Sequence, residues 1–240
     1  MKKHFKRIII SAVVVCALCY GALALYASDF YRSDAMAAAA LKSDDTVSVE
    51  ITDDMAIFRP ENIEAGFVFY PGGKVEYTAY APLMYKLAQN NIACIITEMP
   101  FNLAVMDVDA ADKACEIIAD VDSWYIGGHS LGGSMAAAFA ADSDIRFDGL
   151  VLLASYSTAD LSQKDTEVIS IYGTEDGVLN MEKYQQYYSN LPEDTVEFVI
   201  EGGNHAQFGS YGAQKGDGSA KISADEQIKI TAEKIAEFIK

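Results

Sequence analysis

The chain has few histidine, cysteine and basic residues, and each shortage narrows what it can do. Its 240 residues include three His, four Cys, and 18 Lys and Arg against 35 Asp and Glu. Two cysteines fall in the first 27 residues; Cys94 and Cys115 fall in a predicted buried strand and a helix. Their spacing matches no metal motif, so we expect no metal site and two buried thiols rather than a disulfide.

The shortage of basic residues argues against polyanionic partners. After residue 27 the chain carries 14 Lys and Arg against 35 Asp and Glu, a balance of −21. A surface of this sign repels nucleic acid and anionic lipid head groups. We therefore expect no nucleic-acid partner, and we interpret the charge as a solvated acidic surface.

One long apolar run stands near the start of the chain. Residues 8–27 follow the basic residues Lys2, Lys3, Lys6 and Arg7. As a helix, 20 residues span about 30 Å, the thickness of a bilayer core. We expect residues 1–27 to be an uncleaved signal anchor whose basic end stays in the cytoplasm. This would place the rest of the chain outside the cell membrane, tethered by a single transmembrane helix.

Cleavage of this segment is the alternative. Apolar regions of cleaved signal peptides usually have only about 7–15 residues. A cleavage-like Ala22-Leu23-Ala24 is nevertheless present, and cleavage would leave a secreted protein. Cys16 and Cys19 do not fit a lipoprotein site, because the residues before them are not small.

Strand and helix patterns alternate along the rest of the chain. Residues 28–45 are a polar, Ala-rich stretch that we interpret as a stalk, and residues 46–240 suffice for one domain with one core. We predict strands at 46–52, 55–59, 66–70, 92–97, 123–127, 149–154, 168–173 and 195–200, and helices at 80–90, 110–120, 131–141, 181–190 and 224–239. This alternation predicts an α/β fold with a mostly parallel sheet and helices on both faces. Ligands of such folds bind beyond the carboxyl ends of the strands.

A candidate nucleophile lies at one such strand end. Ser130 is the centre of Gly128-His129-Ser130-Leu131-Gly132, between a predicted strand and a predicted helix. In this context a G-x-S-x-G sequence forms a sharp turn that exposes the serine hydroxyl. Glycines on both sides make the bend sterically possible.

A serine needs a base, and histidine is the usual one. Of the three histidines, His4 lies in the basic N-terminal segment, and the side chain of His129 is directed away from its neighbour in the turn. His205 remains, in a loop just after a predicted strand. An isolated loop histidine would be an ordinary polar residue, but elimination favours His205 as the base.

The base in turn needs a carboxylate to orient it. Asp176 follows the strand predicted at 168–173, and the adjacent Glu175 could do the same chemistry. An acidic loop residue is by default only solvated, but the chain order Ser130, Asp176, His205 is that expected of one hydrolase fold and favours a functional role for Asp176.

Acyl transfer also requires donors for an oxyanion. We expect the backbone N–H of Leu131 to be one and that of Gly73, in the turn after strand 66–70, to be the other, with Lys74 as second choice. An ordinary loop glycine pair is the alternative for Gly72 and Gly73. A phosphate-binding loop is excluded, because Val75 follows Lys74 where Ser or Thr is required.

These motifs make the chain resemble the α/β-hydrolase superfamily from about residue 46 to residue 240. A closer resemblance is to bacterial membrane-anchored serine hydrolases related to dienelactone hydrolases. It rests on Phe69-Tyr70-Pro71-Gly72-Gly73, Met99-Pro100-Phe101-Asn102-Leu103-Ala104 and His205-Ala206-Gln207-Phe208-Gly209. The chain departs from related enzymes in two ways. Pro71 stands where many esterases have the His of a His-Gly turn, and the nucleophile is Ser130 where dienelactone hydrolases generally use Cys.

These residues predict a serine hydrolase of carboxylic esters, without a cofactor, acting on a small-molecule or lipid ester. An acyltransferase or an amidase could use the same triad, and a non-catalytic binding protein could keep the same fold. Only 13 residues separate the strands predicted at 149–154 and 168–173, too few for a lid domain. The Gly-rich stretch 208–218, with Tyr211 and Asp217, is the candidate cover.

Overall fold

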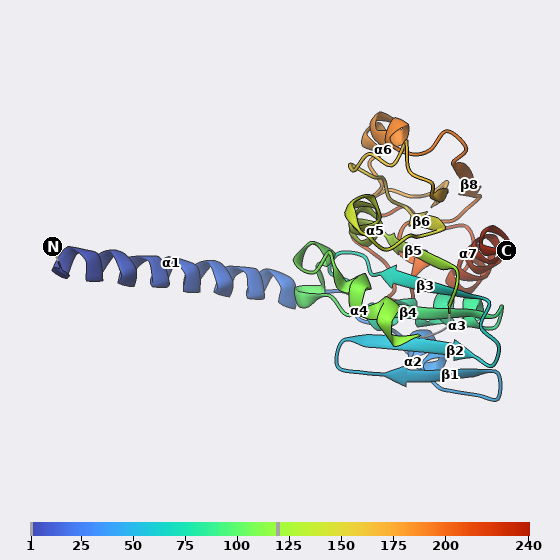
Figure 1. Ribbon diagram of the computed structural model, residues 1–240, viewed down its shortest axis with the longest axis horizontal. Helices are drawn as coiled ribbons and strands as arrows, with labels where there is room; N and C mark the ends of the chain where they lie inside the picture. Colours follow the sequence, from blue (N-terminus) through green and yellow to red (C-terminus); the bar gives the residue numbers. More distant parts are fainter. Residues whose placement is uncertain (1, 119–120) are drawn as a thin grey trace.

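The computed structural model describes residues 2–118 and 121–240. An eight-stranded sheet lies at the centre, in the strand order β1-β2-β4-β3-β5-β6-β7-β8 (Figure 1). β2 is antiparallel to both of its neighbours, and all other neighbouring pairs are parallel. The strands are β1 Val47–Ile51, β2 Met55–Pro60, β3 Ala65–Tyr70, β4 Ile92–Thr97, β5 Trp124–His129, β6 Gly149–Leu153, β7 Glu167–Gly173 and β8 Val196–Ile200.

Helices cover both faces of this sheet, so the predicted fold class is confirmed. The α-helices are α1 Lys2–Ser28, α2 Ala35–Ala40, α3 Ala81–Ala88, α4 Ala110–Ile117, α5 Leu131–Asp142, α6 Met181–Tyr187 and α7 Ala224–Ile239. Short 3-10 helices are η1 Tyr77–Tyr80, η2 Pro100–Asn102, η3 Ala104–Met106, η4 Tyr188–Asn190 and η5 Ala206–Phe208. The helix predicted at 110–120 ends at Ile117, and residues 119 and 120 lie outside the described part.

Each face of the sheet has its own apolar core. Side chains alternate between faces along a strand, so Phe67 and Phe69 pack under α3 and α7, whereas Val68 and Tyr70 pack under α4 and α5. Every residue of β3 and β4 is buried. This two-sided burial explains why these strands are continuous apolar runs. Packing on both faces thus fixes the positions of the parallel strands, and their carboxyl ends meet at one edge of the sheet.

Residues 29–45 pack on the domain, although the sequence suggests a stalk. Tyr31 pairs with Val75 in a parallel bridge, and the Asp34 side chain caps α2 while accepting a hydrogen bond from Ser210 Oγ. Ala37 is fully buried, because small alanine side chains allow α2 to lie close against α3 and η1. Both thiols of the domain are free; Cys94 is buried and Cys115 is half-buried.

The N-terminal helix projects away from the domain (Figure 1). Within Phe5–Ser28 the most apolar 18-residue window has a mean hydropathy of 2.6, and none of that window is buried by the protein. This length and composition suit a membrane crossing or a signal sequence.

Candidate active site

Ser130 occupies a strained turn between β5 and α5. Its φ of 52° and ψ of −120° are uncommon for a residue with a side chain. Its N–H donates to the carbonyl of Leu153 (2.9 Å), which holds the turn against β6. A side chain at position 132 would overlap the carbonyl oxygens of Tyr70 and Pro71, so Gly132 lets α5 approach the end of β3.

His205 and Asp176 form a buried pair at the neighbouring strand ends. His205 Nδ1 lies 2.9 Å from Asp176 Oδ2, and their side chains are only 1% and 3% exposed. The other carboxylate oxygen accepts the N–H groups of Val178 and Leu179, both at 2.8 Å. Glu175 turns away and pairs with Lys221. The structure therefore brings Asp176, rather than Glu175, to the imidazole.

Ser130 and His205 line the same cavity, which has a volume of about 240 Å³. His205 Nε2 is buried and has no hydrogen-bond partner among the described residues. The apolar part of the lining comes from Leu131, Ala154, Tyr156, Val178 and Leu179. A larger cavity, of about 410 Å³, lies between α4 and α5 and contains neither Ser130 nor His205.

The Gly72-Gly73 turn lies directly beside the start of α5. A Cβ atom at Gly73 would sit 3.1 Å from Leu131 Cδ2, so the two residues are in contact. The Lys74 N–H donates to the carbonyl of Asn102 (2.7 Å), whereas in the described residues the Gly73 N–H makes no hydrogen bond. The N–H of Leu131 belongs to the first helical turn and has no partner within the helix.

The model of the alpha/beta hydrolase family matches residues 66–229, which hold Ser130, Asp176 and His205. The chain belongs to this family. None of the curated proteins matches the sequence of this hydrolase.

Solved structures share the fold at low sequence identity. A predicted CIB-like hydrolase from Thermoplasma acidophilum is 13% identical, with a TM-score of 0.57 over 80% of this chain and 99% of its own. Est1E from Butyrivibrio proteoclasticus is 13% identical, with a TM-score of 0.56 over 81% and 97%. A carboxylesterase from Bacillus subtilis is 10% identical, with a TM-score of 0.58 over 84% and 94%.

His129, within the elbow of this hydrolase, links three parts of the site. Its Nδ1 lies 2.8 Å from the Tyr80 hydroxyl, which also accepts the Gly72 N–H at 3.0 Å. Its ring lies against the His205 ring, with centroids 4.5 Å apart. Burial lowers the pKa of His129 well below its ordinary value, so the ring is neutral. The sequence predicted that His129 points away from Ser130 but did not reveal Tyr80 as its partner.

Asp217 fastens the loops that carry Asp176 and His205. Its Oδ1 accepts the N–H groups of Gly177 (3.1 Å) and His205 (3.2 Å), and its Oδ2 accepts that of Ala206 (2.8 Å). The Gly-rich stretch 208–218 does not line the cavity at Ser130; Tyr211 is buried beside Tyr80 and Tyr31 instead. Asp217 is therefore a loop clamp, and its only sequence cue is its place in that stretch.

No metal centre is evident in the ranges 2–118 and 121–240. No group of three or more His, Cys, Asp or Glu side chains gathers there closely enough to hold an ion.

Proposed function

We propose that this α/β hydrolase cleaves carboxylic esters through an acyl-enzyme on Ser130. Ser130 Oγ attacks the acyl carbon while His205 Nε2 takes its proton, and Asp176 orients the imidazole. The amides of Leu131 and Gly73 stabilise the oxyanion. His205 then protonates the leaving alcohol, and water attacks the acyl-enzyme to release the acid.

One observation carries this proposal. The buried His205 ring is held at Nδ1 by Asp176, its Nε2 has no hydrogen-bond partner among the described residues, and His205 lines the same cavity as Ser130. His129 Nε2 is likewise buried and unpaired among the described residues, so the pairing of His205 with Asp176 and its place beside Ser130 carry the assignment. The Lys74 amide is already engaged, so the proposal keeps Gly73 as the second donor.

We also propose that α1 is an uncleaved anchor that tethers the domain outside the cytoplasmic membrane. Its length and hydropathy support this assignment, and the basic residues before it favour a cytoplasmic N-terminus. We further propose a relation to dienelactone hydrolases, which is supported by the sequence stretches 69–73, 99–104 and 205–209.

The test combines a covalent probe with a substrate series. A fluorophosphonate should label the wild-type chain at Ser130 but not the Ser130→Ala variant, and Ser130→Ala should lower ester turnover by roughly 10³–10⁶-fold. Aryl esters of increasing acyl length would then define what the cavity accepts. Full esterase activity in Ser130→Ala would refute the assignment. Labelling without ester turnover would favour an acyltransferase or amidase, and a folded chain that takes up no label would favour a binding protein.

A further inference from the structure

An apolar loop lies next to the outer end of α1. It follows β4 and comprises η2 and η3, residues 100–106. Val105 and Met106 are 54% and 46% exposed, and Phe101 and Leu103 are half-buried. Exposed apolar side chains grouped in this way usually mark a surface that contacts a protein, a membrane or a ligand.

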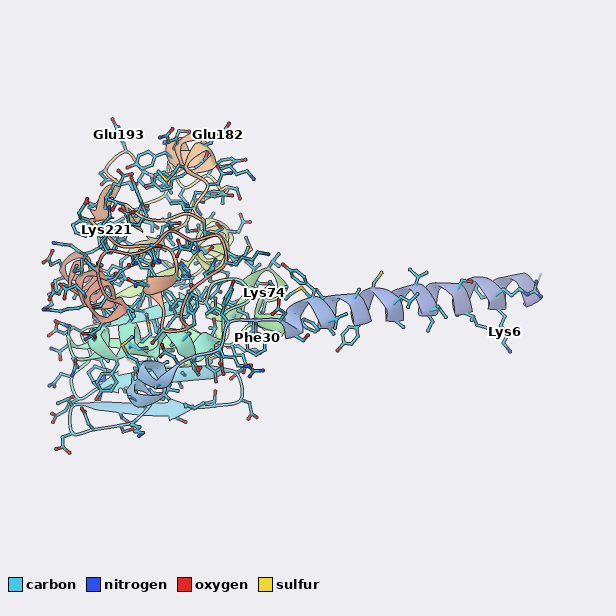
Figure 2. The ribbon with its side chains drawn as sticks, turned by 180° about the vertical axis from the view of Figure 1, so that it is seen from behind. Lys6, Phe30, Lys74, Glu182, Glu193 and Lys221 are labelled. Atoms are coloured by element: carbon cyan, nitrogen blue, oxygen red, sulfur yellow. The ribbon has the colours of Figure 1, made fainter. Side chains whose placement is uncertain are left out.

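The loop touches α1 itself. The rings of Phe101 and Tyr20 meet edge to face, with centroids 5.8 Å apart. Near Tyr26, six residues further along α1, the Lys74 ammonium lies 4.5 Å from the centroid of the Tyr26 ring and pairs with Asp29. Figure 2 shows Lys74 and Phe30 where α1 meets the domain, with Lys6 far out along the helix.

The same loop also contacts the turn that carries the candidate oxyanion donor. The carbonyl of Asn102 accepts the Lys74 N–H (2.7 Å), and the carbonyl of Lys74 accepts the Tyr31 N–H (2.8 Å). The helix thus enters the domain at the Gly73-Lys74 turn. In Figure 1, α1 leaves on the side toward which β3 points, which is the edge where Ser130 lies.

We propose that residues 100–106, the apolar loop, lie in the outer surface of the bilayer that α1 crosses. The mouth of the Ser130 cavity then faces that surface, and the substrate is an amphiphilic ester taken from the membrane. This inference rests on the proposed function, both on the anchor and on the esterase chemistry.

The depth of the loop agrees with a bilayer as its partner. If the hydrocarbon core begins at Ile8, after the basic residues, about 20 residues cross its 30 Å and the outer boundary falls near Ala27. Tyr20, and with it the Phe101 ring, would then lie about 10 Å inside. Apolar faces of surface-bound helices enter membranes by a similar 5–10 Å. The acidic domain would not be drawn to anionic lipids, so apolar insertion rather than charge must supply the attraction.

The first test places a fluorescent reporter on the loop of the full chain in phosphatidylcholine vesicles. Trp124, the only tryptophan, lies at the amino end of β5 and serves as background. Val196→Trp, 50% exposed on the far edge strand β8, is the matched control for Val105→Trp. Brominated acyl chains should quench emission of Val105→Trp beyond that of the wild type and of Val196→Trp. Equal quenching in all three would overturn the proposal, as would a blue shift without quenching, which would indicate a protein partner on the loop.

The second test compares two substrates. For each protein, the measured quantity is the turnover of a long-chain ester in vesicles divided by the turnover of a soluble short-chain ester. The double variant Val105→Asp/Met106→Asp should lower this ratio by at least about tenfold, because two apolar side chains no longer insert into the bilayer. Ile51→Asp, at a similarly exposed site on β1, should leave this ratio unchanged. An unchanged ratio in the double variant would refute the loop's role. If the wild type cleaves neither ester, the proposed esterase function fails instead, and the quenching result still decides the loop.

Discussion

The imidazole rings of His129 and His205 pack against each other, with centroids 4.5 Å apart. The Tyr80 hydroxyl is hydrogen-bonded to His129 Nδ1 and also accepts the Gly72 N–H. The turn that carries one candidate oxyanion donor, the elbow and the candidate base therefore share one buried set of contacts. A neutral, buried ring at this position gives the protein a dependence on pH that can be measured.

Acid should destabilise the fold through His129. Burial lowers its pKa below the ordinary value of 6.5, so below about pH 6.5 the unfolded chain binds a proton that the folded chain does not. Stability therefore falls as pH falls, by at most about 1.4 kcal/mol per pH unit for this proton, until the folded pKa is reached. His129→Asn can still accept the Tyr80 hydroxyl but does not titrate. Urea unfolding in detergent between pH 5 and 8 should show that the free energy of unfolding falls less steeply with falling pH in His129→Asn than in the wild type. Identical pH dependences in the two proteins would contradict the role given to His129.

Asp176→Asn should reduce kcat by about 10⁴-fold, because an amide no longer holds the imidazole in the tautomer that leaves Nε2 free. Glu175→Gln is the matched control, since Glu175 pairs with Lys221 rather than with His205. Steady-state kinetics on a soluble aryl ester should show the loss only in the first variant. Equal losses in both would mean that the neighbouring carboxylate shares the role.

Relieving the backbone strain at Ser130 should raise the free energy of unfolding. Ser130→Gly and Ser130→Ala both remove the nucleophile, but only glycine adopts a φ of 52° without strain. We expect Ser130→Gly to be more stable than Ser130→Ala by about 1 kcal/mol, the strain relieved less the entropy that glycine loses. At Ser134, inside α5, the order should reverse, because glycine disfavours a helix. Denaturant unfolding of the four variants tests both comparisons, and the same order at both positions would contradict them.

Replacing the loop clamp should impair catalysis more than binding. Asp217→Asn puts an amide group where backbone N–H groups of the Asp176 and His205 loops now donate. We expect kcat to fall by about 10–100-fold through misplacement of the imidazole, with a smaller change in KM. Asp160→Asn is the control, since among the described residues the Asp160 carboxylate bonds only to Ser162, within its own exposed turn. A change in KM alone would point to contact with substrate instead.

The sequence alone predicted those strands and helices whose bounds depend on local pattern and topology. Buried parallel strands appear as continuous apolar runs, and Ile92–Thr97 and Ala224–Ile239 begin and end where their patterns do. The hypothesis that His205 is the base followed from the shortage of histidines. The choice between Asp176 and Glu175 needed the structure, because adjacent side chains differ in direction, which depends on the loop.

Other features depend on contacts between segments remote in the chain. Tyr80 and His129 are 49 positions apart, and Ser210 bonds Asp34 across 176 positions. No periodicity or motif encodes such pairs. The packing of residues 29–45 was unexpected for the same reason, since a short alanine-rich helix is stable only when another surface covers it.

The connection from β6 to β7 has a consequence for how the protein selects what it acts on. Between Leu153 and Glu167 the chain forms no helix or strand, so this connection supplies no hinged flap over the cavity. Under the proposed function, this connection then adds no slow opening step of the kind that paces many enzymes. We expect selectivity to depend on where the protein sits and on what its cavity fits.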